Sequence, residues 1–363
     1  MKKISLIISG LKLGGAERVV ADLAGGLKAS GMDVFVVALS PGGIFTPMLR
    51  HQGVAVVEIS TKNPFSVLAE LVQLLNRERP DIVHTHLFYA DLFGSIAAKI
   101  AGNIPVVSTL HNITFGGRFH EWILRMIRPL IAHHSAVAQI VRDYVQLHGI
   151  AKAADVIYNG IDRNYFKRIH SQAEARAMLG LNQGDVIFVS VGRLIDQKGF
   201  SNLIDAFDQM ALKGSKLIIL GEGNLRPALE RRAGKRLGES VFLPGATDLV
   251  RDYLEAADMF VMSSLWEGFS LALVEAAAIG IPIVATRVGI APELMGLEAS
   301  ECMVAPGDIN ALADAMRRLQ ETPLDVRRKR SDRLVGIVDQ KFSRTAMIRA
   351  YTEIYDAISP NKR

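Results

Sequence analysis

Short apolar, β-branched runs alternate with longer segments of helical periodicity along the whole chain. The runs predict strands at Ile4–Ser9, Val34–Leu39, Ile82–His86, Val106–Leu110, Val156–Tyr158, Ile187–Val191, Leu217–Leu220, Val241–Leu243, Met259–Ser263 and Ile283–Thr286. The helical patterns between them include Ala16–Ser30, Ser66–Arg79, Phe200–Ala211 and Ala311–Gln320. Apolar strands separated by helices are typical of parallel sheets that helices cover on both faces.

The alternation begins again after a polar, helix-prone segment, Asn164–Gly184. At 363 residues the chain is long enough for two domains. We therefore predict an α/β protein of two doubly wound, Rossmann-like domains, residues 1–168 and 169–344. Ligands of such sheets bind beyond the carboxyl ends of the strands, so two facing domains would enclose a cleft.

Composition narrows the class of protein. The chain is 49% hydrophobic and 22% charged, and its one cysteine, Cys302, excludes an internal disulfide framework and fits a reducing compartment. The start of the chain predicts a first strand rather than a signal peptide. No apolar run reaches the roughly 18–20 residues of a membrane span. We expect a cytoplasmic protein.

The charge of the chain indicates an anionic partner. The net charge is +5 and the pI is about 9.3. Such a chain attracts nucleotide phosphates, an acidic membrane surface or nucleic acid. Aromatic residues interleaved with basic clusters, as in an RNA-binding sheet, are not evident, so we expect no nucleic-acid partner.

The stretch Leu265–Glu275 joins a predicted strand to an apolar, Ala-rich helix, Leu271–Ile279. A helix start leaves several N–H groups unpaired and carries partial positive charge. The amides that can point at a phosphate are those of Phe269, Ser270 and Leu271. Glu267 precedes the helix, and Glu275 lies one turn inside it, within reach of a sugar hydroxyl. The same pattern also fits an ordinary helix start with two acidic residues.

The loop Gly192–Phe200 carries Arg193 and Lys198 between two glycines at the end of a predicted strand. Arginine grips phosphate oxygens in a fork, and lysine adds a movable point charge. Two solvated surface cations are the alternative interpretation. The chain has no Asp-x-Asp, a motif that holds a divalent metal on the diphosphate in many sugar-nucleotide enzymes. We therefore predict no metal site and expect fixed positive groups to neutralise the diphosphate.

Three features of the first half of the chain are candidates for ligand contact, and each lies in or directly after a predicted strand. Gly10–Gly15 follows the first strand and allows close backbone approach to a ligand, although G-x-G-x-x-G is absent. His84 and His86 share one face of a strand, where packing or hydrogen bonding is favoured over metal binding. His111 follows another strand and is placed to touch a substrate, or else is a satisfied polar loop residue.

The segment 118–131 has a helical apolar stripe of Phe119, Trp122, Ile123, Met126, Ile127, Leu130 and Ile131. Three arginines, Arg118, Arg125 and Arg128, lie off that stripe. A basic amphipathic helix can lie in a membrane interface or hold an anionic head group. Our hypothesis is that it contacts the inner face of the cytoplasmic membrane and a lipid-linked acceptor; core packing with solvated arginines is the alternative.

These motifs, taken together and in order, resemble those of the family 4 retaining glycosyltransferases of GT-B fold. The resemblance spans nearly the whole chain and is carried by Gly14-Gly15, His111, Gly192-Arg193 with Lys198-Gly199, Gly221-Glu-Gly223 and Glu267-x7-Glu275. The segments that begin at Asp81 and at His111 look most like bacterial members that build O-antigen, capsule or other lipid-linked surface glycans. Two departures are Ser270 and Ile290, where many members have glycine.

The resemblance implies roles for individual residues. Arg193 and Lys198 would hold the donor diphosphate, and Gly15 would let the first loop approach it. Glu275 would accept from the ribose hydroxyls, and Glu267 from the transferred sugar. His111 would contact that sugar near the reacting carbon. A final helix, about 345–363, would cross back to the first domain.

The resemblance also implies a reaction. We expect transfer of a sugar from a nucleotide diphosphate sugar, with UDP-hexose or UDP-N-acetylhexosamine as the donor, to a lipid-linked saccharide, with retention and without a metal or other cofactor. Two alternatives stay open. One is a nucleotide-sugar epimerase of the same architecture, and the other is a catalytically silent sugar-nucleotide-binding protein.

Overall fold

The computed structural model describes residues 2–210 and 212–359, which form two compact units. One unit runs to Gly160 and resumes at Ser343, and the other is Ile161–Phe342. The second unit begins at Ile161, earlier than the boundary after residue 168 that the sequence predicted. The reason is that the segment that follows Gly160 is bonded to the second unit. Arg163 donates to Asp339 at 2.5 Å and to the Ala278 carbonyl at 3.0 Å.

The first unit is built on a seven-stranded sheet in the order β3-β2-β1-β4-β5-β6-β7, and all neighbours are parallel. Its strands are β1 (Lys3–Ile8), β2 (Asp33–Ala38), β3 (Ala55–Glu58), β4 (Ile82–His86), β5 (Val106–Leu110), β6 (His133–Ala136) and β7 (Asp155–Val156). The strand order reverses between β1 and β4, which makes the carboxyl ends of these strands the expected place for a ligand.

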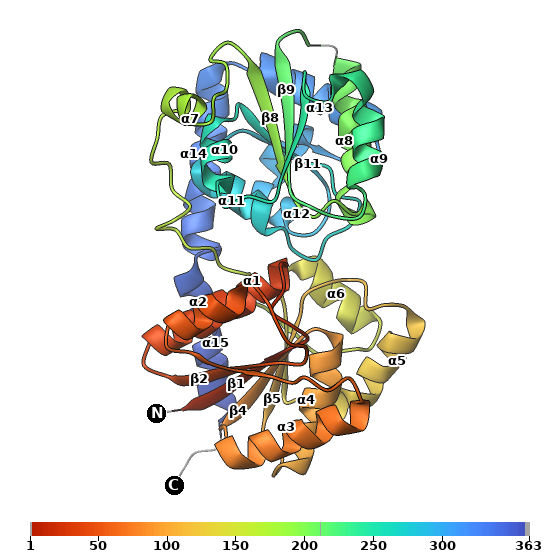
Figure 1. The fold of residues 1–363 in the computed structure, drawn as a ribbon, viewed down its shortest axis with the longest axis vertical. Helices are drawn as coiled ribbons and strands as arrows, with labels where there is room; N and C mark the ends of the chain where they lie inside the picture. Colours follow the sequence, from red (N-terminus) through yellow and green to blue (C-terminus); the bar gives the residue numbers. More distant parts are fainter. Residues whose placement is uncertain (1, 211, 360–363) are drawn as a thin grey trace. The chain divides into compact units, whose positions relative to one another are not determined.

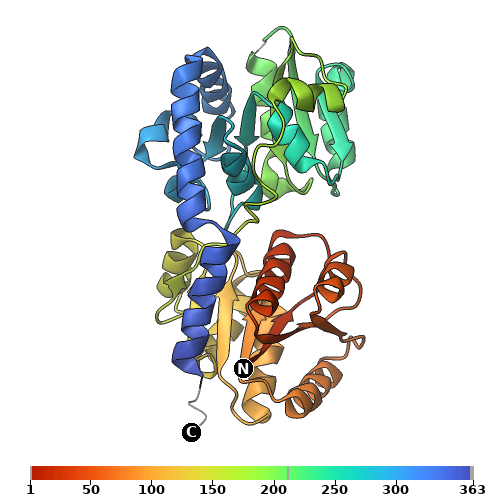
Figure 2. The same cartoon turned by 90° about the vertical axis from the view of Figure 1, so that its left-hand side faces the viewer.

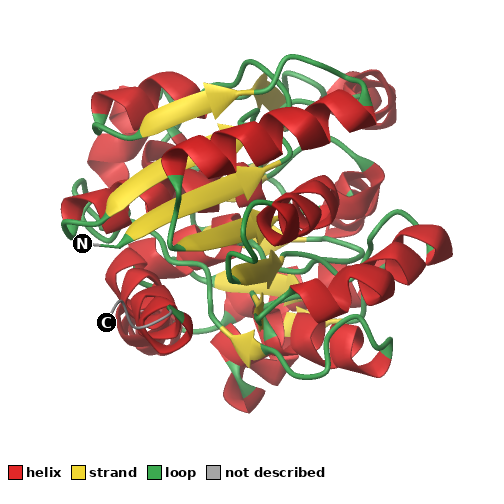
Figure 3. Cartoon of the chain, turned by 90° about the horizontal axis from the view of Figure 1, so that it is seen from below, coloured by secondary structure: helices red, strands yellow, loops and turns green. Residues whose placement is uncertain are grey.

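Helices cover both faces of this sheet, as Figures 1 and 3 show. They are α1 (Gly15–Ala29), α2 (Phe45–His51), α3 (Pro64–Glu78), α4 (Phe88–Ile100), α5 (Arg118–Ile127), α6 (Gln139–Leu147) and α15 (Arg344–Ile358). Helix α1 packs against α2 and α15, whereas α3 packs against α4. The final helix therefore belongs to the first unit, and the end of its expected range, 360–363, lies outside the described residues.

The second unit repeats the plan with a six-stranded parallel sheet in the order β10-β9-β8-β11-β12-β13. Its strands are β8 (Val186–Val191), β9 (Ser215–Leu220), β10 (Val241–Gly245), β11 (Met259–Met262), β12 (Ile283–Thr286) and β13 (Met303–Val304). The switch point lies between β8 and β11. The prediction of two Rossmann-like α/β domains is confirmed.

The helices of the second unit are α7 (Gln172–Met178), α8 (Phe200–Met210), α9 (Arg226–Ala233), α10 (Val250–Ala256), α11 (Leu271–Ile279), α12 (Ala291–Met295), α13 (Ile309–Glu321) and α14 (Leu324–Lys341). The longest, α14, runs along one side of this unit (Figure 2). Local sequence sets several helix starts: Ser171 and Glu174 form a capping box before α7, and Asp308 caps α13.

Burial follows the alternation seen in the sequence. Every residue of β4 and of β5 is buried, as fully covered parallel strands require. Within the described part of the chain, we find no helix with the length and apolar character needed to cross a bilayer.

Candidate functional site

In the second unit, the loops after β8 and β11 meet at the switch point and bring Lys198 to Glu267. The Lys198 ammonium donates to Oε1 of Glu267 at 2.5 Å. Ser264 donates to the same oxygen at 2.8 Å, and Gln197 donates to Oε2 at 3.2 Å. Glu267 is buried, so these three donors, one of them a cation, satisfy its carboxylate oxygens in the absence of bulk water.

Glycine allows the two loops to approach this closely. Gly199 has φ +61°, and a Cβ there would collide with the carbonyl oxygen of Ser263. Gly221 has φ +138°, and a Cβ there would collide with the carbonyl oxygen of Gly192. Both positions combine a left-handed backbone with a backbone neighbour that cannot move aside. The glycines that the sequence drew attention to therefore shape the Arg193–Lys198 loop.

Helix α11 begins beside this ion pair, with the bounds that the sequence predicted. Ser270 is its N-cap, and its hydroxyl accepts from the Leu273 amide at 3.4 Å. The amides of Phe269, Ser270 and Leu271 donate to no group that the structure describes. They are therefore open to an anion, as a phosphate seat requires. The departure at Ser270 leaves the helix start intact because its hydroxyl caps the helix.

The other two predicted donor-site residues differ in their surroundings. Arg193 is exposed, and its guanidinium makes no hydrogen bond or ion pair with any residue that the structure describes. Glu275 is half-buried on the first turns of α11 and interacts with another residue of the chain. Gly289, at φ +54°, packs its backbone against Glu267, and Ile290 after it is fully buried. At position 290, where many family members have a second glycine, this chain therefore has a core residue.

In the first unit, the carboxyl ends of β4 and β5 bring His86 and His111 together. Nδ1 of His86 lies 2.9 Å from Nε2 of His111. His84, two residues earlier on β4, hydrogen-bonds Tyr355 at 2.6 Å and Thr109 at 2.7 Å. The hydrogen-bonding interpretation of the two β4 histidines is confirmed. Burial lowers the pKa of His111 to about 4 and that of His86 well below its ordinary range, so both rings are neutral at pH 7.

The loop after β1 ends where α1 begins. Gly14 is the N-cap, in an extended conformation, and Gly15 is the first residue of the helix and exposed. Gly15 thus lies at the carboxyl end of a strand beside the switch point of the first sheet. This is the position from which a backbone amide can approach a ligand.

The basic amphipathic segment differs from its prediction. Helix α5 ends at Ile127, and a 3₁₀ turn, Arg128–Leu130, follows, because proline at 129 disfavours a further α-helical turn. Arg125 and Arg128 donate to the carbonyl oxygens of His148 and Gly149, at 2.6 and 2.9 Å. These two arginines therefore fasten α5 to the end of α6.

The apolar face of α5 is divided between core and solvent. Leu124 and Ile127 are buried, but Phe119, Trp122 and Met126 are 68%, 52% and 62% exposed. These last three, spaced as neighbours on one helix face, are called the apolar stripe of α5 below. The stripe is an exposed feature of the first unit and not part of its core.

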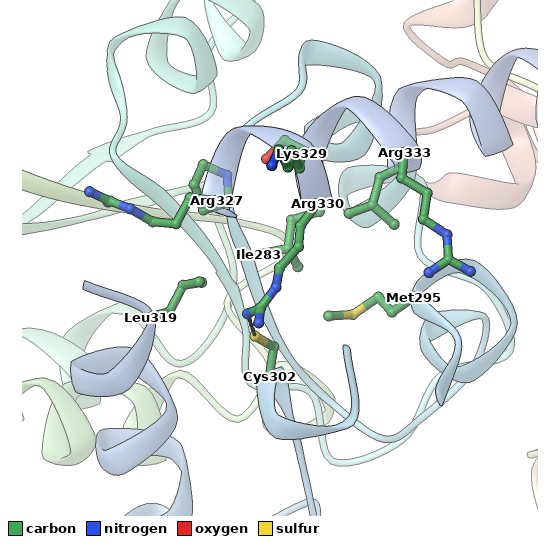
Figure 4. A pocket seen from close by; sticks show the side chains of 11 residues that line it. Ile283, Met295, Cys302, Leu319, Arg327, Lys329, Arg330 and Arg333 are labelled. Carbon is green, nitrogen blue, oxygen red and sulfur yellow. Dashed lines mark hydrogen bonds between the residues drawn. The ribbon is translucent and has the colours of Figure 1, made fainter. Parts of the chain in front are cut away.

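Two other features of the second unit are separate from the predicted site. His170, Asp252 and Glu255 form the one metal-compatible group found among the described residues, and Glu255 already accepts from the Ile169 amide at 2.5 Å and from His170 at 3.0 Å. A hollow of about 230 Å³ lies beneath α14. In Figure 4, Arg330 reaches Cys302, whereas Arg327 and Arg333 point in opposite directions. The hollow contains none of the sequence-predicted site residues.

Three contributors were not identified from the sequence. Gln197 and Ser264 complete the contacts of Glu267, and His86 contacts His111. Gln197 adjoins Lys198, but an uncharged residue in a loop gives no signal by itself. For His86, the position at the end of a strand was visible, but its neighbour on β5 was not.

Comparison with known proteins gives two family models that cover different parts of the chain. The model described as "Glycosyltransferase Family 4" matches residues 13–165. The model described as "Glycosyl transferases group 1" matches residues 185–322. The first range covers most of the first unit and ends shortly after Gly160, and the second range lies within the second unit.

Individual relatives match over most of their length. The chain is 28% identical to a UDP-Gal:alpha-D-GlcNAc-diphosphoundecaprenol alpha-1,3-galactosyltransferase of Escherichia coli, covering 72% of each chain. It is 26% identical to an N-acetyl-alpha-D-glucosaminyl L-malate synthase of Bacillus anthracis, covering 80% of this chain and 78% of that one. Among solved structures, HepE of Anabaena in complex with UDP-glucose has a TM-score of 0.86 at 25% identity, covering 99% and 100%.

Proposed function

Because the chain belongs to the family 4 glycosyltransferases of GT-B fold, we propose that it transfers a sugar from a UDP-sugar, a hexose or N-acetylhexosamine, to a lipid-linked saccharide in bacterial surface polysaccharide synthesis. The observation that supports this most directly is the switch point of the second sheet. The loops there carry the Lys198–Glu267 ion pair, the exposed Arg193 and three amides that have no acceptor among the described residues. Cations and open amides together suit a diphosphate.

The donor is held by residues with distinct tasks. Arg193 and Lys198 bind the diphosphate, together with the amides before α11. Glu275 accepts from the ribose hydroxyls, and Glu267 accepts from the transferred sugar through the capacity that its three present donors leave. On the first unit, Gly15 approaches the diphosphate and His111 contacts the sugar near its reacting carbon.

The reaction proceeds with retention and without a covalent enzyme intermediate. The acceptor hydroxyl attacks the anomeric carbon from the face that the diphosphate leaves, and a donor phosphate oxygen receives the acceptor's proton. Three hydrogen bonds, one of them from the Lys198 ammonium, engage the Glu267 carboxylate, which makes it a poor nucleophile. The fixed cations stabilise charge on the departing diphosphate in the place of a metal ion.

The relatives reported above support transfer over the epimerase alternative. One is named a galactosyltransferase and the other a synthase. The name of the galactosyltransferase contains a diphosphoundecaprenol acceptor, which fits a lipid-linked acceptor for this chain too. An epimerase would convert its nucleotide sugar with no acceptor present, so omission of the acceptor separates the two activities.

Contact with the acceptor's membrane is assigned to the apolar stripe of α5. Phe119, Trp122 and Met126 are exposed, whereas two of the arginines of this segment are occupied by carbonyl groups. Aromatic and thioether side chains on a helix can enter the boundary between head groups and acyl chains. The protein would then act as a peripheral enzyme on the inner face of the cytoplasmic membrane.

UDP binding to single-site variants tests the donor site. We expect UDP to raise the melting temperature of the wild type, because it binds the folded state only. Arg193→Ala should weaken UDP binding about tenfold or more in isothermal titration calorimetry, since a charge-assisted contact is lost. The control is Arg328→Ala, which removes the same charge from an exposed position on α14. If the two variants bind UDP with equal affinity, Arg193 is not part of the donor site.

Product analysis tests the reaction. With a UDP-sugar and a panel of lipid-linked saccharides, the anomeric configuration of the product should match that of the donor in NMR spectra. Inversion, or a sugar trapped covalently on Glu267, would contradict the proposed course.

A further inference from the structure

The contact between His86 and His111 leaves one ring nitrogen without a partner. His86 is the last residue of β4 and is fully buried. Its Nδ1 lies 2.9 Å from Nε2 of His111, while its own Nε2 is buried and has no partner among the described residues. Nδ1 of His111 makes no hydrogen bond with the described residues and is the nitrogen left for a ligand.

The His86 ring is held in place by its neighbours. The ring of His84 packs against it with centroids 4.1 Å apart, and His84 is itself fixed by hydrogen bonds to Tyr355 and Thr109. Leu87, the next residue, has φ 73° and ψ 158°, a backbone conformation that is costly for leucine. Strain of this kind persists where the surroundings fix the chain, and here it lies directly after His86.

The unpartnered nitrogen decides where the shared proton lies. A neutral imidazole carries one N–H, and the His86–His111 contact uses one N–H in total. If His111 donated through Nε2, the proton of His86 would be on Nε2, as a buried donor without an acceptor. If His86 donates through Nδ1, its Nε2 is a bare lone pair. Buried N–H groups without partners are rarer than buried acceptors without partners, so the second arrangement is favoured.

We propose that His86 is a positioning residue that fixes His111 in the Nδ1–H tautomer and so presents a hydrogen-bond donor to the sugar of the bound donor. His86 donates from Nδ1 to Nε2 of His111, and no proton is transferred in the reaction. This proposal rests on the proposed function, in which His111 contacts the transferred sugar, and adds which nitrogen of His111 makes the contact and what orients it.

The geometry of side chains offers a matched pair of variants at position 86. The side-chain amide nitrogen of asparagine occupies the place of Nδ1 of histidine, whereas that of glutamine occupies the place of Nε2. His86→Asn therefore keeps a donor toward His111, and His86→Gln lacks one. His86→Phe retains the volume and removes both nitrogens.

Tautomers can be observed in two-bond ¹H–¹⁵N correlation spectra of the ¹⁵N-histidine-labelled full chain, with the His111 signals identified by their loss in His111→Asn. We expect the Nδ1–H form for His111 in the wild type and in His86→Asn. In His86→Phe and His86→Gln the Nε2–H form should appear. An Nε2–H form in the wild type, or an Nδ1–H form that persists in His86→Phe, would overturn the proposal.

Turnover of the same variants provides the kinetic readout. We expect His86→Phe and His86→Gln to lower kcat about tenfold to hundredfold with little change in the KM of the donor. The reason is that His111 then no longer donates its hydrogen bond to the sugar near the reacting carbon. His86→Asn should recover most of the activity. Equal kcat values for His86→Asn and His86→Gln would indicate a packing role only.

A control separates positioning from general damage to the sheet. His134→Phe makes the same change at another buried histidine, on β6. It should lower the melting temperature without changing the His111 tautomer or kcat. If instead His111→Ala itself leaves turnover unchanged, the proposed contact of His111 with the sugar fails, while the tautomer measurement still decides the role of His86.

Discussion

The ammonium nitrogen of Lys198 lies 2.5 Å from Oε1 of Glu267, and the two side chains are only 16% and 4% exposed. A buried ion pair of this kind is costly to break from one side, because the remaining charge stays buried. The residue assigned to the diphosphate and the residue assigned to the sugar are therefore one structural unit before any ligand arrives. The pair also links the loop after β8 to the turn before α11.

The first prediction follows from that coupling. Lys198→Ala should lower the free energy of unfolding by about 2–4 kcal/mol, since Glu267 keeps Ser264 and Gln197 but loses its cation. Arg193→Ala, at an exposed position without a partner in the described chain, should change it by less than about 0.5 kcal/mol. Urea unfolding measures both, and UDP affinity should fall in both.

The companion variant distinguishes charge from shape. In the double variant Lys198→Ala/Glu267→Gln, the buried negative charge is gone, so part of the stability lost in Lys198→Ala should return. If the double variant is less stable than Lys198→Ala, the loss is due to packing and not to an isolated carboxylate.

The second prediction concerns acid stability. Burial lowers the pKa of His111 and His134 to about 4 and that of His84 and His86 well below the ordinary range. Unfolded histidines have a pKa of about 6.5, so below that pH the unfolded chain binds protons that the folded unit does not. The free energy of unfolding should therefore fall as pH drops from about 6.5 to about 4, by about 1.4 kcal/mol per pH unit for each histidine.

Asp91 opposes this trend. Burial raises its pKa to about 7, so between about pH 7 and 4 the folded chain holds a proton that the unfolded chain lacks. One such group offsets about one of the four histidines, so the net effect of acid remains destabilising. The urea concentration at the midpoint of unfolding should be lower at pH 5 than at pH 8. The decrease should be larger in Asp91→Asn than in the wild type, because asparagine cannot bind that proton. A midpoint that is constant from pH 7 to 5 would contradict the buried neutral histidines.

The third prediction concerns the ribose. Glu275→Gln should weaken UDP binding about fivefold to tenfold, because a hydrogen bond from a hydroxyl to a charged acceptor is lost. Binding of 2′,3′-dideoxy-UDP should be nearly the same in wild type and variant, because this ligand lacks the hydroxyls. Calorimetry with both nucleotides measures the difference. An equal loss for both ligands would mean that Glu275 acts on the fold of α11 and not on the ribose.

The fourth prediction concerns the apolar stripe of α5. Changing Phe119, Trp122 and Met126 to serine together should lower the partition onto vesicles rich in anionic lipids about tenfold or more, because buried apolar area is lost. Melting temperature should change little, since the three side chains are exposed. Co-sedimentation with vesicles measures the partition.

A matched control exists in the same unit. Phe65 on α3 is 83% exposed, so Phe65→Ser removes an exposed aromatic ring outside α5. Its partition should equal that of the wild type. If the triple variant also partitions like the wild type, the stripe is not the membrane contact.

The fifth prediction concerns metals. Transfer should persist in excess EDTA, since Arg193, Lys198 and the helix start supply the positive charge. The kcat of the wild type with and without EDTA measures this directly. Loss of activity that Mg²⁺ or Mn²⁺ restores would show that the cations of the chain are insufficient for the diphosphate.

Local pattern predicted much of the secondary structure. The bounds of β4, β5, β12 and α11 match those expected, because continuous apolar runs are strong signals for covered strands and apolar helices. Three strands were not expected. β3 (Ala55–Glu58) is an edge strand that is only partly buried, β6 (His133–Ala136) contains two histidines and a serine, and β13 (Met303–Val304) has two residues. Their pairing partners, and not their own residues, make them strands.

The sequence by itself determined the fold class, the family and the loops that carry Arg193, Lys198 and Glu267, because hydrophobic period and local motifs are properties of neighbouring residues. Only the tertiary structure decided that Lys198 is bonded to Glu267 and His86 to His111. In both cases the two residues lie at or beyond the carboxyl ends of different parallel strands, and their distance depends on strand order and register. These are set by packing of the whole sheet, which no short stretch of sequence contains.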